Sequence, residues 1–162
     1  MTQDLSGKIF IIDNVLEQSE CDELIHCYNL NGPTHQWDNF FPMSIDMSNE
    51  YLKNYILKIE NSINQFLNDK IAVDWCEIVR WPIGSFKLPH KDITSKETTF
   101  TSVTYLNDNY IGGETYIVDD IKIVPKTGRT FFFDGVFYTH GVTEVLKSNR
   151  YTLPIWYKIK TV

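Results

Sequence analysis

Two periodicities of apolar residues divide the chain. Up to about residue 68 the longer apolar patterns have helical spacing, after one short strand-like segment at 8–13. From about residue 71 onward, short segments rich in β-branched and aromatic residues alternate with turn residues. Helices followed by a run of strands predict an α+β, mainly β, architecture.

The segment 49–70 has the clearest helical pattern in the chain. Its apolar residues recur at helical spacing: Leu52, Tyr55, Ile56, Ile59, Ile63, Phe66 and Leu67. We expect this helix to lie against a sheet. An earlier helix is predicted within 15–32, with Ser19 as its candidate N-cap and Asn31-Gly32 at its end.

The segment between these helices, GPTHQWDNFFPMSID at 32–46, has no clear period. It carries Trp37, Phe40 and Phe41 between two prolines, so we expect an irregular loop. An aromatic loop of this kind is either ordinary packing or a lid over a binding site. The polar segment 93–99 is a second candidate cover for the mouth of a site.

Seven short segments carry the strand pattern: 71–81, 98–108, 112–118, 121–125, 128–135, 139–145 and 149–159. This number of strands predicts a jelly roll (double-stranded β-helix, cupin-like) with helices on the outer face of one sheet. A ligand would bind between the two sheets. We expect one domain over 1–162, with bracing helices at about 16–68 and the jelly-roll core at about 71–160.

Composition and charge narrow the functional classes. The 162 residues are 43% hydrophobic and carry a net charge of −6, which argues against nucleic acid or an anionic membrane as the main partner. The three cysteines form no C-x-x-C pair, which is typical of a reducing compartment. Residues 1–13 have neither the basic start nor the long apolar run of a signal peptide. We therefore expect a cytoplasmic protein, from a bacterial or viral source. The oligomeric state is left open.

Candidate chemistry begins at LPHKD, where His90 and Asp92 lie two residues apart and share one side of an extended chain. Alone, such a pair is more often a surface feature than a metal site. His140, in a Gly-bounded turn, is the best candidate for a third ligand. Two histidines and one carboxylate form the ligand set of non-haem Fe(II) oxygenases, which leaves metal positions open.

Arg150 lies ten residues after His140, so a hairpin could return it to the metal. A guanidinium in an apolar pocket binds a carboxylate such as that of 2-oxoglutarate (2OG) through two parallel hydrogen bonds. Thr152 points the same way on the strand and could add a hydroxyl donor. The alternatives are a strand-edge salt bridge for Arg150 and ordinary packing for Thr152. His26 and His35 are expected to be structural or solvated.

Residues 75–158 resemble the catalytic core of the prolyl 4-hydroxylase-like Fe(II)/2OG dioxygenases. The matching pieces occur in the family's order: HKD at 90–92, VTYLND at 103–108, IGGET at 111–115, PKTGRTFFFDG at 125–135, HG at 140–141 and RYTLPIWY at 150–157. The resemblance implies that His90, Asp92 and His140 bind Fe(II). It also implies that Arg150 and Tyr105 bind the distal carboxylate of 2OG and that Trp81 lies beside its metal-proximal end. O2 would be the oxidant, with ascorbate as a further candidate cofactor.

The implied reaction couples oxidative decarboxylation of 2OG, to succinate and CO2, with hydroxylation of a prolyl residue in a peptide or protein. Collagen-type relatives use Lys where this chain has Arg150, whereas oxygen-sensing and many bacterial and viral relatives use Arg. That difference weakens any inference about the substrate. A free amino acid or other small molecule stays an alternative substrate, and a non-catalytic cupin-like metal-binding barrel is the third hypothesis.

Overall fold

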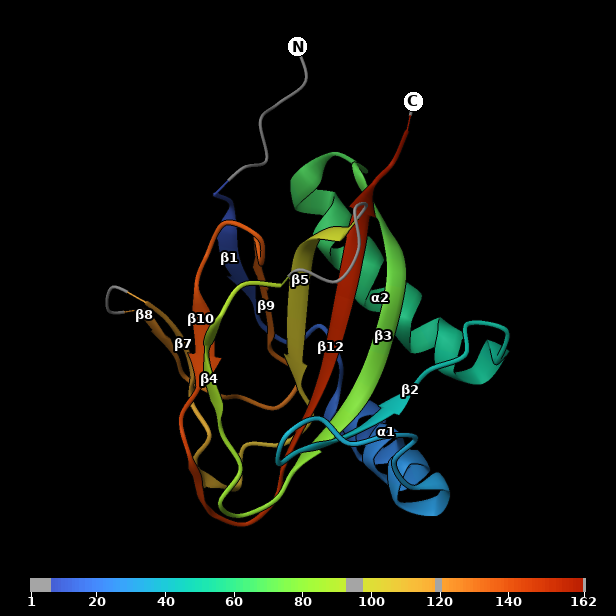
Figure 1. The fold of residues 1–162 in the computed structure, drawn as a ribbon. Helices are drawn as coiled ribbons and strands as arrows, with labels where there is room; N and C mark the ends of the chain where they lie inside the picture. Colours follow the sequence, from blue (N-terminus) through green and yellow to red (C-terminus); the bar gives the residue numbers. More distant parts are fainter. Residues whose placement is uncertain (1–6, 93–97, 119–120, 162) are drawn as a thin grey trace.

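A computed structural model describes residues 7–92, 98–118 and 121–161. These residues form two helices and twelve strands, arranged in a six-stranded sheet, a four-stranded sheet and a two-stranded sheet. The two larger sheets face each other (Figure 1), and every strand pair that the structure defines is antiparallel. The predicted jelly roll is confirmed.

The larger sheet has the order β1-β9-β5-β12-β3-β2. Its strands are β1 (Ile9–Ile12), β9 (Thr130–Phe133), β5 (Thr98–Tyr105), β12 (Arg150–Ile159), β3 (Ile71–Trp81) and β2 (Phe41–Ser44). The longest two, β3 and β12, are neighbours over almost their whole length. The smaller sheet contains β4 (Lys87–His90), β10 (His140–Val142), β7 (Thr115–Ile117) and β8 (Ile121–Ile123). A ribbon of β6 (Ile111–Gly112) and β11 (Val145–Lys147) closes one end.

Strand β12 divides the interior into two parts by strict alternation of its side chains. Leu153, Ile155 and Tyr157 point outward from the barrel into the main apolar core. The even-numbered residues of the strand point inward and line the cavity between the sheets: Arg150, Thr152, Pro154 and Trp156. The same strand therefore supports both the packing of the helices and the candidate site.

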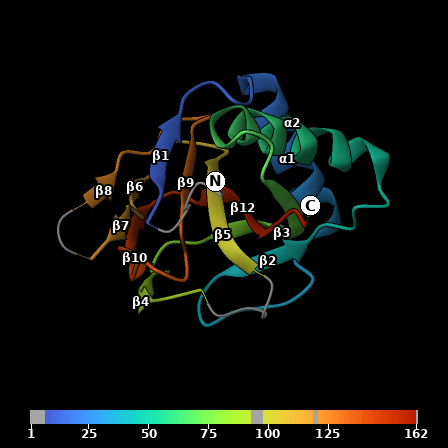
Figure 2. The ribbon, with the colours of Figure 1, turned by 90° about the horizontal axis from the view of Figure 1, so that it is seen from above.

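Helices α1 (Gln18–Asn31) and α2 (Glu50–Leu67) lie on the outer face of the larger sheet, opposite the smaller sheet (Figure 2). Ile56, Ile59 and Ile63 of α2 are completely buried in the core beneath this sheet. The predicted packing of this helix against a sheet is thus confirmed. No helix among the described residues is both long and apolar enough to span a membrane.

Three expectations about the N-terminal half are wrong. Ser19 is not the cap of α1, because Glu17 is the N-cap and forms a reciprocal capping box with Glu20. The loop predicted at 32–46 contains strand β2, which pairs with β3 and extends the sheet by one strand. Phe66 was expected on the buried face of α2, but it is 61% exposed and contacts the ring of Phe10 at the helix end.

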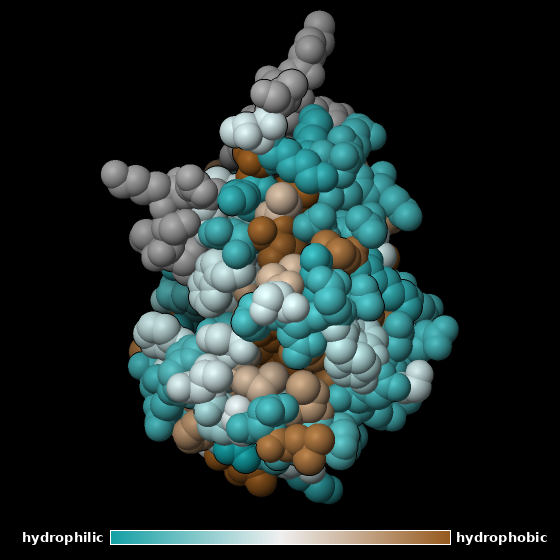
Figure 3. All heavy atoms as spheres, turned by 90° about the vertical axis from the view of Figure 1, so that its right-hand side faces the viewer, coloured by the Kyte–Doolittle hydropathy of each residue, from teal (hydrophilic) through white to brown (hydrophobic). Residues whose placement is uncertain are grey.

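The apolar face of the sheet is well covered by the helices. From the right-hand side of Figure 1 the surface is mainly hydrophilic, with apolar residues along the middle and at the lower end (Figure 3). Of the predicted polar cover at 93–99, residues 93–97 lie outside the described residues.

We expect Ile59→Ala to lower the free energy of unfolding by about 2–5 kcal/mol, because it leaves a cavity where α2 meets the sheet. Phe66→Ala on the same helix is the matched control, with an expected loss of about 1 kcal/mol or less, since the ring is mostly exposed. Urea unfolding followed by circular dichroism measures both. Equal losses would contradict this account of the core.

Candidate metal centre

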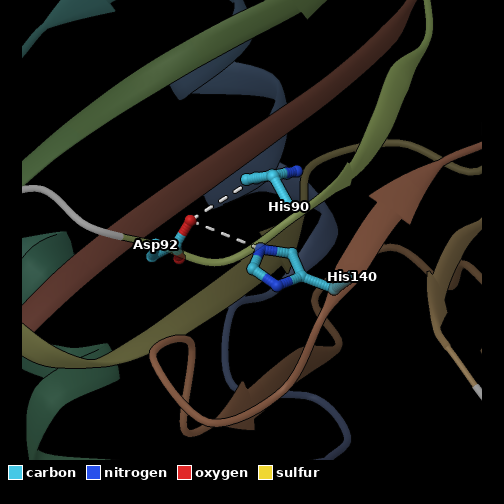
Figure 4. Close-up of side chains that lie close together, drawn as sticks. All are labelled: His90, Asp92 and His140. Carbon is cyan, nitrogen blue, oxygen red and sulfur yellow. Dashed lines mark ion pairs between the residues drawn. The ribbon is translucent and has the colours of Figure 1, made fainter.

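Three candidate ligands meet where β4 and β10 pair. His90 is the last residue of β4, Asp92 follows two residues later, and His140 is the first residue of β10. The two histidines are direct partners in the strand register, and the three side chains converge (Figure 4). His140 lies within the strand predicted at 139–145, and not in a turn. Its place at the start of a strand fixes its backbone more firmly.

The distances suit coordination of one ion. Asp92 Oδ1 lies 3.5 Å from His90 Nε2 and 3.4 Å from His140 Nε2. All three ligand atoms lie within 4.8 Å of one another. Asp92 and His140 are buried, and His90 is partly exposed, so the cluster is open to the outside on the His90 side.

The hydrogen bonds of both imidazoles leave Nε2 free to ligate. His90 Nδ1 lies 2.9 Å from the carbonyl oxygen of Leu88, and His140 Nδ1 lies 2.9 Å from that of Tyr138. A carbonyl can only accept, so each Nδ1 must carry a proton. Each Nε2 faces Asp92 Oδ1 and would ligate a metal once it has given up its own proton. This arrangement orients ligating histidines in metal sites.

The Asp92 carboxylate is held by its second oxygen. Oδ2 accepts hydrogen bonds from Thr101 Oγ1 at 2.6 Å and from Trp156 Nε1 at 3.3 Å, so Oδ1 is turned toward the histidines. Burial raises the pKa of Asp92, but hydrogen bonds from His140, His90 and Thr101 outweigh it and hold the pKa well below its usual range. The carboxylate is therefore ionised, as a metal ligand must be.

Gly135 lets the chain pass directly over this carboxylate. Its carbonyl oxygen accepts the Asp92 backbone N–H at 2.8 Å. A Cβ at position 135 would lie 2.6 Å from both Asp92 Oδ2 and Thr101 Oγ1, distances that real Cβ atoms do not show. Only glycine fits there without displacing the carboxylate or its donor.

A cavity of about 120 Å³ joins this cluster to Arg150. Besides the candidate ligands, its walls include Phe40, Glu77, Val79, Trp81, Val103, Thr115, Phe133, Val142, Arg150, Thr152, Pro154 and Trp156. Most of these side chains are apolar, so charged groups inside the cavity interact in a medium of low dielectric constant.

The Arg150 guanidinium is buried, with 1% of the residue exposed. Nη2 donates to Thr115 Oγ1 at 3.0 Å, while Nε and Nη1 have no hydrogen-bond partner among the described residues. The aromatic rings of Trp81 and Tyr105 lie 4.8 and 5.7 Å from the guanidinium carbon. An unpaired buried cation is costly, so this one is suited to a bound carboxylate.

Tyr105 lies beside Arg150 as predicted, but its hydroxyl donates to Thr115 Oγ1 at 2.8 Å. Because Thr115 also accepts from Arg150, its own proton is free for a ligand in the cavity. The buried Tyr110 hydroxyl has no partner among the described residues, and burial raises its pKa to about 12. Gly113, with φ +61°, lies against both residues, since a Cβ there would lie 2.9 Å from Arg150 Cδ and 3.4 Å from Tyr110 Cε2.

Trp81 and Thr152 also line the cavity. Trp81 Nε1 donates to Thr152 Oγ1 at 3.1 Å, and the indole stacks on Phe40 with ring centroids 4.1 Å apart. The hydroxyl of Thr152 accepts this bond and keeps its own proton available to a ligand. Of the aromatic residues in the predicted lid, Phe40 is thus part of the cavity wall, whereas Trp37 is 53% exposed.

The structure brings all seven predicted site residues into one region. Sequence reasoning missed Thr115, Tyr110 and Glu77. Thr115 follows the IGGE turn directly, and that proximity was the available signal. Glu77 was detectable because it is the one acidic residue on a face of β3 that otherwise carries the apolar residues Trp75, Val79 and Trp81. No sequence signal distinguishes Tyr110 from the other loop tyrosines.

Residues 76–158 match the model of the 2OG-Fe(II) oxygenase superfamily. This is about half of the chain, and it includes every predicted site residue. Among curated proteins, none matches the chain.

Several solved structures share the fold. A viral collagen prolyl hydroxylase from Paramecium bursaria Chlorella virus-1, in complex with 2OG, has a TM-score of 0.77 and 24% identity, over 94% of this chain and 96% of that one. A prolyl-4-hydroxylase from Pseudomonas putida has a TM-score of 0.75 and 18% identity, over 96% and 94%. A Trichoplax adhaerens prolyl hydroxylase in complex with a hypoxia inducible factor peptide fragment has a TM-score of 0.71 and 21% identity, over 93% and 83%.

We expect Thr101→Val to weaken divalent metal binding by about 10- to 100-fold, because Asp92 loses a donor that orients it. Thr104→Val is the matched control. Its hydroxyl bonds Thr130 Oγ1, away from the cavity, and metal affinity should stay within about threefold of wild type. Anaerobic titration with Fe(II) or Co(II) measures both. A loss of similar size in the control would point to a general loss of structure.

Proposed function

Because this chain belongs to the 2OG-Fe(II) oxygenase superfamily, we propose that it is a hydroxylase acting on a prolyl residue of a peptide or protein. The observation that carries the proposal is the cavity with a two-histidine, one-carboxylate cluster and an unpaired buried guanidinium in its walls. The prolyl substrate is supported by the three structural relatives, which are all prolyl hydroxylases, one of them in complex with a peptide.

In this proposal His90, Asp92 and His140 hold Fe(II). With O2 as the oxidant, bound Fe(II) and 2OG would supply the oxidising chemistry, in which one atom of O2 enters succinate as 2OG loses CO2 and the other is inserted into a substrate C–H bond. Three protein ligands on one side of an octahedral ion leave the other positions for exogenous ligands. Neither histidine acts as an acid or base, because each must stay neutral at Nε2.

Arg150 binds the distal carboxylate of 2OG. Its two unpaired nitrogens, Nε and Nη1, and the free proton of Thr115 are donors that a carboxylate would satisfy. Tyr105 supports this group through Thr115, so its predicted role becomes an indirect one in our proposal. Trp81, fixed by Thr152, forms the wall beside the co-substrate and helps to exclude water.

We further propose that 1–162 acts as one catalytic domain in a reducing compartment such as the cytoplasm. Strand β12 contributes to both the helix core and the cavity, which supports a single domain. The three cysteines are free, and Cys21 and Cys76 are buried. Burial raises the pKa of both thiols to about 12, which makes them poor nucleophiles at neutral pH.

An anaerobic experiment tests the proposal directly. Purified protein with Fe(II) and 2OG should develop a weak visible charge-transfer band, and exposure to oxygen should remove the band as succinate forms. Proline-containing peptides should then increase succinate formation more than free proline does. Folded protein with neither band nor succinate would favour a barrel without this chemistry, and stimulation by free proline alone would favour the small-molecule alternative.

We expect Arg150→Ala to weaken 2OG binding by about 100-fold or more while divalent metal affinity stays within about threefold, because the loss removes charge-assisted hydrogen bonds from a buried site. The matched control is Arg129→Ala, which removes a guanidinium that pairs with Asp13 instead. Calorimetric titration of 2OG into the metal-loaded variants measures the difference. Unchanged 2OG affinity in Arg150→Ala would remove this residue from the site.

A further inference from the structure

Glu77 has no part in the reaction proposed above, yet it lies in the wall of the same cavity. It points inward from the middle of β3, between Trp75 and Val79 on the same face of the strand. The residue is only 3% exposed. A carboxylate in this position costs folding free energy, so its partners are informative.

Its ion-pair partner among the described residues is His35, whose Nε2 lies 2.9 Å from Glu77 Oε1. His35 belongs to the loop between α1 and β2, and its side chain is 31% exposed. Thr34 Oγ1 lies 2.8 Å from His35 Nδ1, and the ring of Trp37 packs edge-on against the imidazole at 5.6 Å. The partner of this buried acid is thus a partly exposed side chain on a loop.

The loop itself is tied to the cavity at two further points. Phe40 stacks on Trp81 inside the cavity wall, and Asp38 forms a 2.8 Å salt bridge with Lys87 of β4. His35 therefore covers Glu77 from a segment that borders the site mouth. For another cation to bind Glu77, the His35 imidazole must leave the carboxylate.

The surroundings of Glu77 favour a cation as its ligand. Burial raises the pKa of Glu77 to about 7. A cation bound beside the carboxylate would stabilise the charged form that burial disfavours. On the same face of β3, Trp75 stacks on Trp156 of β12 with ring centroids 3.7 Å apart. Trp156 lines the cavity together with Glu77, so a positive charge there can gain from both an indole ring and a carboxylate.

We propose that Glu77 is a specificity-determining residue that binds a positively charged group of the substrate. In the free protein, His35 occupies the position beside Glu77 that this charged group would take. This inference rests on the proposed function, since it concerns the substrate of the same cavity. The cation is either a basic side chain next to the target residue of a peptide or the ammonium group of a free amino acid. The chemistry of recognition is the same for both.

The test compares wild type with Glu77→Gln, which keeps the side-chain shape and removes the charge, and with His35→Ala. Glu50→Gln is the charge-matched control, because its side chain is 78% exposed on α2. Probes are proline-containing peptides with arginine on either side of proline, the same peptides with citrulline instead, and free proline against N-acetylproline. Binding is measured by calorimetry without oxygen, in the presence of Fe(II) and 2OG.

We expect wild type and Glu50→Gln to bind one cationic probe at least tenfold more tightly than its neutral counterpart. Glu77→Gln should remove this preference, and His35→Ala should strengthen it severalfold by removing the competing group. Preference among the peptides identifies a basic side chain, and preference for free proline identifies an ammonium group. Thermal unfolding and 2OG titration of each variant report whether the cavity is intact.

The inference is overturned if wild type binds every cationic probe no better than its neutral counterpart, or if Glu77→Gln keeps the preference. If Glu77→Gln fails to fold, the test rests on His35→Ala. A preference for the cationic probe equal to that of wild type in His35→Ala would overturn the inference, because His35 would then not compete for Glu77. Failure of wild type to bind Fe(II) and 2OG at all would contradict the proposed function, which is a different result.

Discussion

The alternation of side chains along β12 is the constraint on which the rest of the structure depends. This strand lies between β3 and β5 in the larger sheet, so its outward side chains are covered by the helices and its inward side chains by the opposite sheet. A shift of register by one residue would exchange the two sets and place Arg150 in the apolar core. The apolar residues Leu153 and Ile155 thus determine where the charge of Arg150 lies.

The candidate site has two charged side chains, Asp92 and Arg150, that are buried from solvent. Asp92 is surrounded by donors, with Thr101 and Trp156 on one oxygen and the two histidines near the other. The Arg150 guanidinium, in contrast, lacks acceptors: its Nε and Nη1 have no hydrogen-bond partner among the described residues. A site with one satisfied anion and one unsatisfied cation is prepared for a metal ion at the first and an anionic ligand at the second.

Much of this could be predicted from the sequence because the strands carry period-two patterns and the ligands lie in short motifs. The bounds of β3 at 71–81 and the grouping of His90 with Asp92 followed from local pattern alone. The missed features depend on long-range contacts. Strand β2 forms because β3 offers a free edge, and the Glu77–His35 pair joins residues 42 positions apart in the chain, a contact that no local pattern encodes.

The position of β12 also affects how the protein is made. It is the last strand of the described chain, yet it occupies the centre of the larger sheet, and its neighbours β3 and β5 precede it by dozens of residues. During synthesis neither the helix core nor the cavity can be completed until this strand has left the ribosome. Until then, β3 and β5 each have an unpaired edge where β12 will bind. A nascent chain that stops before residue 150 would expose the unpaired edges of β3 and β5 and would be a target for chaperones and proteases.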